Sequence, residues 1–366
     1  MMEKSTLILT RKIRLIVDLP TQEERKEVLS TLYKWRNICF RAANLIVSHL
    51  YVQEMVKDFF YFSEEIKYKL VDENKDEDGM LECSRINSIY RMLSNRFKGE
   101  IPTNILICLN NRLYSSFNKD YQGYLKGEAS LKNFKRDIAF PFGLVGISRL
   151  SYHPEKKSFC FRLFQLPFKT YLGKDFIGNK RLLEQVINGE IKLCTSQIKI
   201  EKGKIFWLAV VEIEKEKNQL QPEIIAEASL SLEYPLVAKV GKSRLTIGTK
   251  EEFLYRRLAI QASRKRTQVG VAYAKSGKGR TRKLKALEKM SQLERNYVHN
   301  RLHVYSRKLI DFCINNKAGT LILLDQEEKM ELAKEEEFVL RNWSYYELMT
   351  KIKYKADKAG IELIIA

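Results

Sequence analysis

The chain has 366 residues, enough for two or three domains with cores of their own, and its formal net charge is +20 at pH 7. This excess of lysine and arginine favours a polyanionic partner, nucleic acid before an anionic membrane, over a merely solubilising surface, because the bases are clustered. No apolar run approaches the roughly 20 residues of a membrane span, and the N-terminus lacks a signal-peptide layout, so we expect a cytoplasmic protein.

The N-terminal third reads as one strand followed by helices. Residues 6–19 are rich in β-branched residues, which predicts a strand with Arg11, Lys12 and Arg14 on its exposed face. Pro20-Thr21 opens a helical pattern that runs to about Lys69.

Two interpretations of this first helix remain open. It carries Arg36 and Arg41 beside aromatic residues, as expected of a helix that stacks bases and holds phosphates. The alternative is a helical core with arginines that extend to its surface, and for Trp35 alone we favour core packing. An acidic loop at 71–79, a helix at 84–96 and a helix from Thr103 follow.

A basic connector spans residues 123–142. Lys132, Lys135 and Arg136 lie beside Phe134, a combination that suits phosphate contact with one stacking surface, although a basic surface loop would look the same. Alternating residues then predict three strands and a hairpin turn at 201–204, and the polar run 215–222 predicts a domain boundary. The three strands are Ser158–Leu166, Ile191–Ile200 and Ile205–Glu214.

Residues 223–250 predict a hairpin, and residues 253–312 predict a long helical segment. Twelve bases and one acid lie between Arg256 and Lys289, and we expect Gly270, Gly277 and Gly279 to break the helix into a basic elbow. A solvated helix face normally mixes both signs of charge, so this segment is the strongest compositional indication of nucleic-acid binding.

His299 and His303 are spaced i, i+4 on the same predicted helix. No glutamate follows His299 to complete an H-E-x-x-H motif, so a solvated or phosphate-facing pair is favoured over zinc, and no metal site is expected here. The six cysteines form no C-x-x-C pair and are expected to be reduced thiols. They are Cys39, Cys83, Cys108, Cys160, Cys194 and Cys313.

The last stretch predicts a strand–helix–strand unit. Its strands are Leu321–Leu324 and Ile361–Ile365, and its helix starts near Ser344, an N-cap with Glu347 as capping-box partner. The string Asn342–Leu348, with the residues that follow it to Ile361, resembles the RuvC-type nuclease domain of the TnpB superfamily. It is most similar to the miniature type V-F CRISPR effectors, as are the connector and residues 189–207.

The resemblance implies an α+β multidomain fold. A wedge β-barrel would take residues 1–20 and 123–218, and a helical recognition lobe would take residues 21–122. Residues 219–366 would form a RuvC-like (RNase H-like) α/β domain that lacks its zinc ribbon and looks truncated.

The resemblance also locates the acidic positions of a two-metal nuclease. Counting back from Gly241 puts Ser229 in the first aspartate position, or Ala228 if the register slips by one, and Leu324 takes the glutamate position. The third acid lies beyond the end of this chain. Magnesium needs hard oxygen ligands, so we expect no catalytic residues and no cleavage. Asp325, Glu227 and Glu233 are the nearby carboxylates.

The implied function is RNA-guided DNA binding without nuclease activity. Expected partners are a guide RNA and double-stranded DNA with a short adjacent motif, with no cofactor besides the RNA. A second copy around one RNA is usual for the family. Binding to the target would place the protein on the bacterial nucleoid. The residues expected to contact nucleic acid are Arg36, Arg41, Lys132, Phe134, Lys135, Arg136, Arg256, Arg257, Arg264, Lys265, Arg266, Lys278, Arg280, Arg282, Lys283, Trp343, Tyr345 and Lys355.

Transcriptional regulation by recruitment of a sigma factor and RNA polymerase is the favoured role. The alternatives are an RNA-guided repressor that blocks polymerase and a nuclease with a rearranged metal site that uses Asp325 or Glu227. Two further alternatives are an RNA-binding protein without a DNA target and a decayed transposon remnant without a function.

Overall fold

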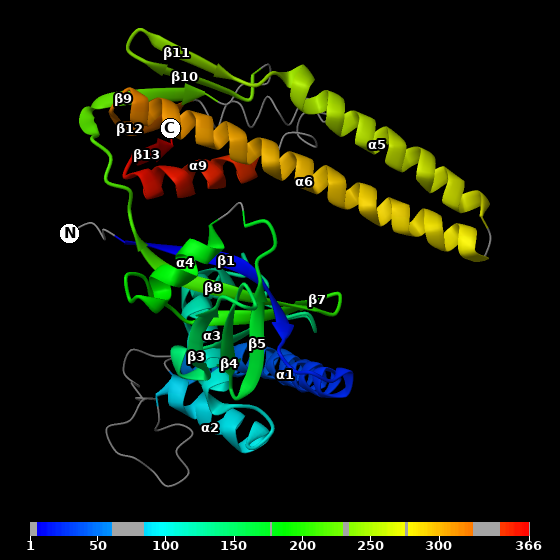
Figure 1. Ribbon diagram of the computed structural model, residues 1–366. Coiled ribbons are helices and arrows are strands. Elements are labelled where there is room, and N and C mark those ends of the chain that lie inside the picture. The colour runs from blue at the N-terminus through cyan, green and yellow to red at the C-terminus, as the bar shows by residue number, and fades with distance from the viewer. Residues whose placement is uncertain are drawn as a thin grey trace. The chain divides into compact units, whose positions relative to one another are not determined.

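The computed structural model of the chain describes residues 6–60, 84–175, 178–229, 234–274, 277–324 and 345–365 (Figure 1). The chain divides into two units, one made of residues 8–213 and the other of residues 1–7 and 214–366. The predicted loop at 71–79, and with it Cys83, lies outside the described residues. No helix in the described ranges has an apolar stretch long enough to cross a membrane.

Three helices of the first unit pack on one another: α1 (Gln22–Phe60), α2 (Arg85–Phe97) and α3 (Thr103–Leu125). α1 begins with a capping box, in which Glu24 N–H donates to Thr21 Oγ1 and Thr21 N–H donates to the Glu24 carboxylate. The helices predicted at 84–96 and from Thr103 are confirmed, and Trp35 is buried, with its ring edge-on to Phe140 and Phe164.

The first unit also contains an eight-stranded sheet in the order β2-β7-β8-β1-β5-β4-β3, with β6 paired to β8. Among the described residues β2 and β3 end this sheet without pairing to each other, so the expected barrel is not closed. β2 has only three residues, and its central Pro141 has no N–H to donate to a second neighbour. The strands are β1 (Thr6–Val17), β2 (Phe140–Phe142), β3 (Ile147–His153), β4 (Ser158–Leu163), β5 (Leu166–Tyr171), β6 (Lys192–Leu193), β7 (Ser196–Glu201) and β8 (Lys204–Glu214).

Three strand predictions need correction. The single strand predicted over 191–200 is two strands, β6 and β7, separated by Cys194 and Thr195. In β1, Lys12 and Arg14 alternate with buried Ile13 and Leu15, but Arg11 shares the parity of the buried residues and is half-buried. The single strand predicted over 158–166 is a hairpin of β4 and β5, because Phe164 and Gln165 form its turn in the left-handed region, at φ 46° and 71°. Glycine or asparagine usually marks such a turn, and neither is present.

The predicted turn at 201–204 is confirmed. β7 and β8 pair antiparallel with Glu201 opposite Lys204, and Lys202 and Gly203 take φ 49° and 73°. One short helix was not predicted, α4 (Asn179–Ile187), and its backbone N–H groups at Asn179 and Lys180 donate to the Asp175 carboxylate.

Asp18, just after β1, is the subject of a prediction. Its carboxylate accepts a hydrogen bond from Lys156 Nζ at 2.7 Å and pairs with Lys169, and the first of these contacts is the main reason that its pKa is lowered. A lowered folded pKa adds stability above the unfolded value, and that stability is lost as the pH falls through the folded pKa. Asp18→Asn should cost about 1 kcal/mol at pH 7 and progressively less below pH ~4. Urea unfolding at several pH values measures this, with exposed Asp137→Asn as the control; a loss that does not change with pH would contradict it.

The second unit contains a five-stranded sheet in the order β11-β10-β9-β12-β13. β9 (Gln221–Ser229), β10 (Leu236–Val240) and β11 (Ser243–Ile247) are antiparallel, whereas β12 (Ala318–Leu324) and β13 (Glu362–Ile365) run parallel to β9. The predicted strand–helix–strand unit is confirmed, with α9 (Tyr345–Ala359) between β12 and β13; its predicted cap Ser344 lies outside the described residues. β9 and β12 approach closely at Gly319, where a Cβ would lie 2.7 Å from the Gln221 carbonyl oxygen.

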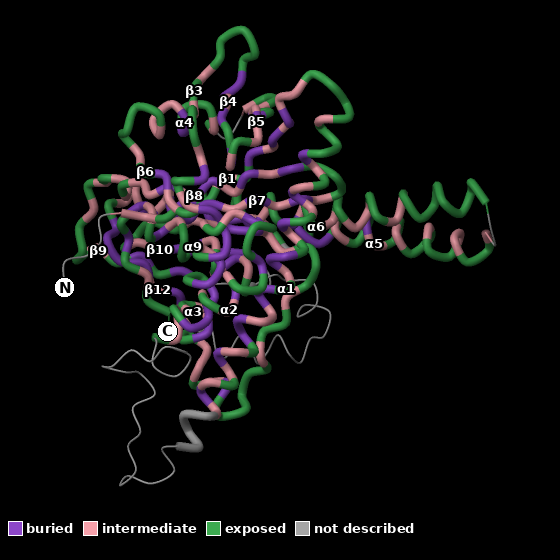
Figure 2. Tube along the Cα trace, turned by 90° about the horizontal axis from the view of Figure 1, so that it is seen from below, coloured by how far each residue is buried: buried purple, intermediate pink, exposed green. Residues whose placement is uncertain are grey.

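Two long helices connect β11 to β12: α5 (Lys250–Tyr273) and α6 (Gly277–Asn315). They run antiparallel as a hairpin. The C-terminal part of α6, from Val298 onward, is the root of this hairpin and packs on β10, β11, β12 and α9 (Figure 1). α5 ends at Tyr273 and α6 begins at Gly277, so Gly270 and Gly279 lie inside helices, and of the three glycines only Gly277, at φ 83°, lies at the break. We call residues 261–297 the arm. None of its described residues is buried, as the green and pink tube shows (Figure 2).

Candidate functional site

The two positions expected to carry metal-binding acids lie side by side in the sheet. Ser229 ends β9 and Leu324 ends β12, and in the parallel register of these strands Ser229 is paired with Leu324. On its other side Ser229 is paired with Val237 of β10. Three neighbouring strand positions therefore present a hydroxyl, an isobutyl and an isopropyl group.

Burial separates the two faces of this sheet. Ala228 and Leu323 are buried against the core that α6 and α9 cover, whereas their neighbours Ser229 and Leu324 are only half-buried. Glu227 is exposed and lies on the Ser229 face, as strand alternation relative to Ala228 requires. Its register partners are Lys239 and Ile322. Asp325 and Glu233 lie outside the described residues.

The arm carries seven of the fifteen lysines and arginines predicted to bind nucleic acid. Lys265, Arg266 and Lys278 are exposed, as are Arg280 and Arg282. Exposed apolar side chains flank these bases on α5, above all Tyr255 and Tyr273, which are 79% and 83% exposed. A basic surface with exposed aromatic rings suits phosphate contact combined with base stacking.

Other predicted bases hold the arm together. Arg257 Nε donates to Glu294 Oε1 at 3.0 Å, both side chains being 14% exposed, and Arg264 lies 4.0 Å from the same carboxylate. Lys283 Nζ donates to the Gly270 carbonyl at 2.8 Å, across the hairpin. Near the root, Arg256 lies over the Tyr297 ring at 5.9 Å. Because the arm has no buried core, these polar contacts set the spacing of its helices.

In the first unit, α1 is linked to the basic connector through one side chain. Asn44 Nδ2 donates to the Phe134 carbonyl at 3.1 Å, and Phe134 N–H donates to Asn44 Oδ1 at 2.9 Å. The Phe134 ring packs against the core, which leaves less of it for stacking. Lys132 is tied to α3 by Ser116 and Asp120, whereas Lys135 and Arg136 are exposed.

A cavity of about 390 Å³ lies beside this link. Arg41 and Arg96 line it from α1 and α2, with the Arg41 guanidinium 5.3 Å from the centre of the Phe97 ring. Arg36 lies over the Tyr33 ring at 4.7 Å. The remaining lining residues are Phe40, Asn44, Leu45, Ser48 and Phe97.

Asn44→Ala should detach the connector from α1. It removes both hydrogen bonds to Phe134 and leaves a half-buried backbone N–H and C=O without their partner, which we expect to lower the free energy of unfolding by about 1–3 kcal/mol. Urea unfolding measures the loss. Asn37→Ala, an exposed change on the same helix, controls for the helix propensity of alanine. Equal effects of the two substitutions would contradict the role of Asn44.

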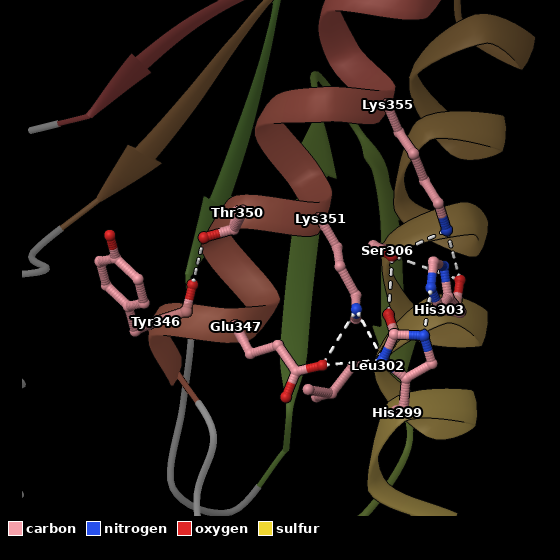
Figure 3. Close-up of polar contacts among 9 residues, drawn as sticks. All are labelled: His299, Leu302, His303, Ser306, Tyr346, Glu347, Thr350, Lys351 and Lys355. Carbon is pink, nitrogen blue, oxygen red and sulfur yellow. Dashed lines mark hydrogen bonds and ion pairs between the residues drawn. The ribbon is translucent and has the colours of Figure 1, made fainter. Parts of the chain in front are cut away.

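A polar cluster joins α6 to α9 in the second unit (Figure 3). Glu347 Oε1 lies 3.0 Å from His299 Nδ1 and 3.0 Å from Lys351 Nζ. Lys355 Nζ donates to the His303 carbonyl at 2.5 Å and to Ser306 Oγ at 2.8 Å. The Lys355 ammonium, which the sequence predicts to contact nucleic acid, is thus engaged within the fold. Trp343 lies outside the described residues, and Tyr345 is described only as the first residue of α9.

Burial and charge set the protonation of this cluster. Burial, reinforced by Lys351 and Lys355, lowers the pKa of His303 to about 4, so this ring is neutral at pH 7. Burial, with Arg307 and Lys351 close by, lowers the pKa of Lys355 to about 8. Burial opposes ionisation of Glu347, but hydrogen bonds from His299 and Lys351 prevail and lower its pKa.

Comparison with known proteins finds relatives that are similar to this chain in sequence and in fold. No protein-family model matches it. The CRISPR-associated endodeoxyribonuclease Cas12f1 of Sulfoacidibacillus thermotolerans is 24% identical over 259 residues, which cover 66% of this chain and 60% of that protein. Cas12f1 of Syntrophomonas palmitatica is 34% identical over 91 residues, 25% of this chain and 18% of that protein. The fold matches the Cas12f1 chain of a cryo-EM complex with single guide RNA and target DNA, with a TM-score of 0.67 over 98% of this chain and 89% of that one, at 16% identity.

This chain is a homologue of the type V-F protein Cas12f1. It spans about 60% of the length of the first of these curated relatives. The mixed α+β fold with two sheets agrees with the resemblance recognised in the sequence.

The described ends of β9 and β12 offer too few oxygen ligands for the two magnesium ions that the resemblance implies. Ser229 offers one neutral oxygen, and its neighbours Leu324 and Val237 offer none. Glu227 supplies a carboxylate on the same face, two residues earlier in β9, which is roughly 6–7 Å along the strand. No group of three or more potential metal ligands occurs among the described residues.

Most of the predicted nucleic-acid residues that the structure describes fall into two sets, one on each unit. Arg41 and the connector meet through Asn44, and the arm gathers the bases from Arg264 to Lys283. Sequence reasoning missed Asn44, Arg96 and the contact of Glu347 with His299. A polar Asn44 between the buried residues Ala43 and Ile46 was the available indication; nothing in the sequence indicates which residue Glu347 contacts.

Proposed function

We propose that the chain is an RNA-guided DNA-binding protein that does not cleave its target. Homology to Cas12f1 supports the guide RNA and the DNA, and the exposed bases of the arm supply the phosphate contacts that such binding needs. The observation that carries the second half of the proposal is the register pair of Ser229 and Leu324, which leaves neutral side chains where hydrolysis needs metal-bound carboxylates.

A bound complex that does not cut can act on transcription. We propose that it recruits a sigma factor and RNA polymerase, with the repressor that blocks polymerase as the alternative. A reporter gene placed at increasing distances downstream of the target separates the two. Recruitment gives a signal that rises above the target-free control at a fixed spacing, whereas a block lowers expression from any promoter upstream of the target.

A residual nuclease is the second candidate, because Glu227 lies on the Ser229 face of the sheet. Its prediction is metal-dependent cleavage of guide-matched DNA that Glu227→Gln or Asp325→Asn abolishes. A homodimer around one RNA would appear as a doubled protein mass per RNA in light scattering of the purified complex.

The deciding experiment is recovery of the RNA that travels with the protein. The chain is expressed with its native flanking DNA and purified, and the bound RNA is sequenced. One dominant structured RNA with a short variable 3′ segment would support the proposal, and that segment would identify the DNA target. Only bulk ribosomal and transfer RNA would contradict it and leave a non-specific basic RNA-binding protein.

A further inference from the structure

Two histidines of α6 face each other through their outer ring nitrogens. His299 Nε2 and His303 Nε2 are 3.1 Å apart, with ring centres 4.5 Å apart and planes crossing at 76° (Figure 3). A zinc ion that binds two imidazole nitrogens at 2.0–2.1 Å with a tetrahedral angle holds them about 3.3 Å apart. The two rings would therefore need to separate by only about 0.2 Å to bind such an ion.

The contact behind His299 is the one that metal-binding histidines commonly make. Glu347 Oε1 and Lys351 Nζ lie 3.0 and 3.1 Å from His299 Nδ1. In the tautomer that donates from Nδ1 to the Glu347 carboxylate, the Nε2 lone pair faces His303 and would bind a metal ion in place of that contact. Lys351 Nζ also lies 3.0 Å from Glu347, so the carboxylate balances the lysine charge next to the pair. His299 and His303 are both exposed, so solvent and ions can reach the pair.

A phosphate suits this cluster less well than a cation does. Anion binding needs free N–H donors, but Lys351 is 11% exposed and directed at Glu347 and His299. Lys355 already donates to the His303 carbonyl and to Ser306. The groups that remain on the solvent side are two imidazoles, which favour zinc, nickel and copper over magnesium and calcium.

We propose that His299 and His303 form a binding site for a divalent late-transition-metal ion such as Zn²⁺. The chain supplies two ligands from one helix turn, Glu347 orients the first, and water or an oxygen of a bound partner completes the coordination. The described residues offer no third ligand, and Lys351, Lys355 and Arg307 nearby disfavour added positive charge, so the affinity should be modest. The site does not depend on the proposed function.

Calorimetric titration of the tag-free, RNA-free chain with Ni²⁺ at pH 7.5, in a buffer with a metal-compatible reductant, tests the proposal. We expect one equivalent of Ni²⁺ bound with modest affinity, no heat with Mg²⁺, and at least a tenfold loss of affinity in His299→Asn and in His303→Asn. His153→Asn, which removes a histidine on the other unit, is the matched control and should leave the titration unchanged.

Glu347→Gln tests whether the Glu347 carboxylate supports metal binding by His299 or only links α9 to α6. Removing the carboxylate behind His299 should weaken Ni²⁺ by roughly 10-fold while both ligands and the stoichiometry stay. Circular dichroism and urea unfolding confirm that each variant is folded. No binding to the wild-type chain would overturn the proposal, and so would an equivalent of unchanged affinity in the folded His299→Asn, His303→Asn double variant.

Discussion

Guide-loaded protein should hold matched double-stranded DNA intact in Mg²⁺ or Mn²⁺. A metal ion supplies several kcal/mol of transition-state stabilisation in phosphodiester hydrolysis, and about 4 kcal/mol corresponds to roughly a thousandfold in rate. The paired strand ends carry serine and leucine at the positions where the proposed RuvC-like assignment expects carboxylates. We therefore expect cleavage at least a thousandfold slower than that of an active relative.

The assay uses a supercoiled plasmid with the target, incubated with the protein and the RNA recovered from cells. Cas12f1 of Sulfoacidibacillus thermotolerans with its own guide is the positive control. Binding is followed in parallel by gel shift, because an intact plasmid is informative only when it is occupied. Nicked or linear product that depends on the guide and disappears in Glu227→Gln would refute the prediction and establish the second candidate.

The second large effect should come from the arm. Each phosphate neutralised contributes about 0.9 to the log–log slope of affinity against salt for duplex DNA and about 0.7 for single strands. Lys265→Ala, Arg266→Ala and Arg282→Ala together remove three exposed bases. The slope should therefore fall by about 2 to 3, and the affinity at low salt should fall accordingly.

Filter binding of the guide RNA and of guide-matched DNA at several salt concentrations gives the slope. The control variant replaces three exposed lysines outside the arm, Lys26, Lys174 and Lys217, and has the same net charge as the arm variant. If both variants lose the same slope, the charge acts without a defined surface and the arm is not an interface. Arg257 stays unchanged in both, because it holds the two helices together through Glu294.

Periodicity predicted most of the elements, because burial of an apolar face repeats along the chain. The strand–helix–strand unit and the helices at 84–96 and from Thr103 all followed from it. The turn at Phe164-Gln165 could not be predicted, since residues of this kind rarely take positive φ and tertiary packing holds them there: the Phe164 ring lies against Gly146 and Trp35.

The sequence predicted those parts of the candidate site that can be located by counting residues from a nearby glycine. Counting from Gly241 and Gly319 indicated Ser229 and Leu324, and the strand register pairs them. Arg257, Lys283 and Lys355 show the limit of composition, because a sequence does not distinguish a base that is free to bind phosphate from one that donates to its own fold. Contacts between distant segments decide that, as with Glu347 and His299, which are 48 residues apart.

The close approach at Gly319 has a consequence for how this sheet could change its chemistry. With Gln221 backbone where a Cβ would lie, and with the register shifting between Ala318 and Thr320, the alignment of β9 and β12 is set at the far end of the strands from Ser229 and Leu324. The side chains at Ser229 and Leu324 can therefore be substituted without an insertion or deletion in either strand. The ends of β9 and β12 could thus gain or lose carboxylates by point substitution at Ser229 and Leu324 while the register of the two strands stays the same.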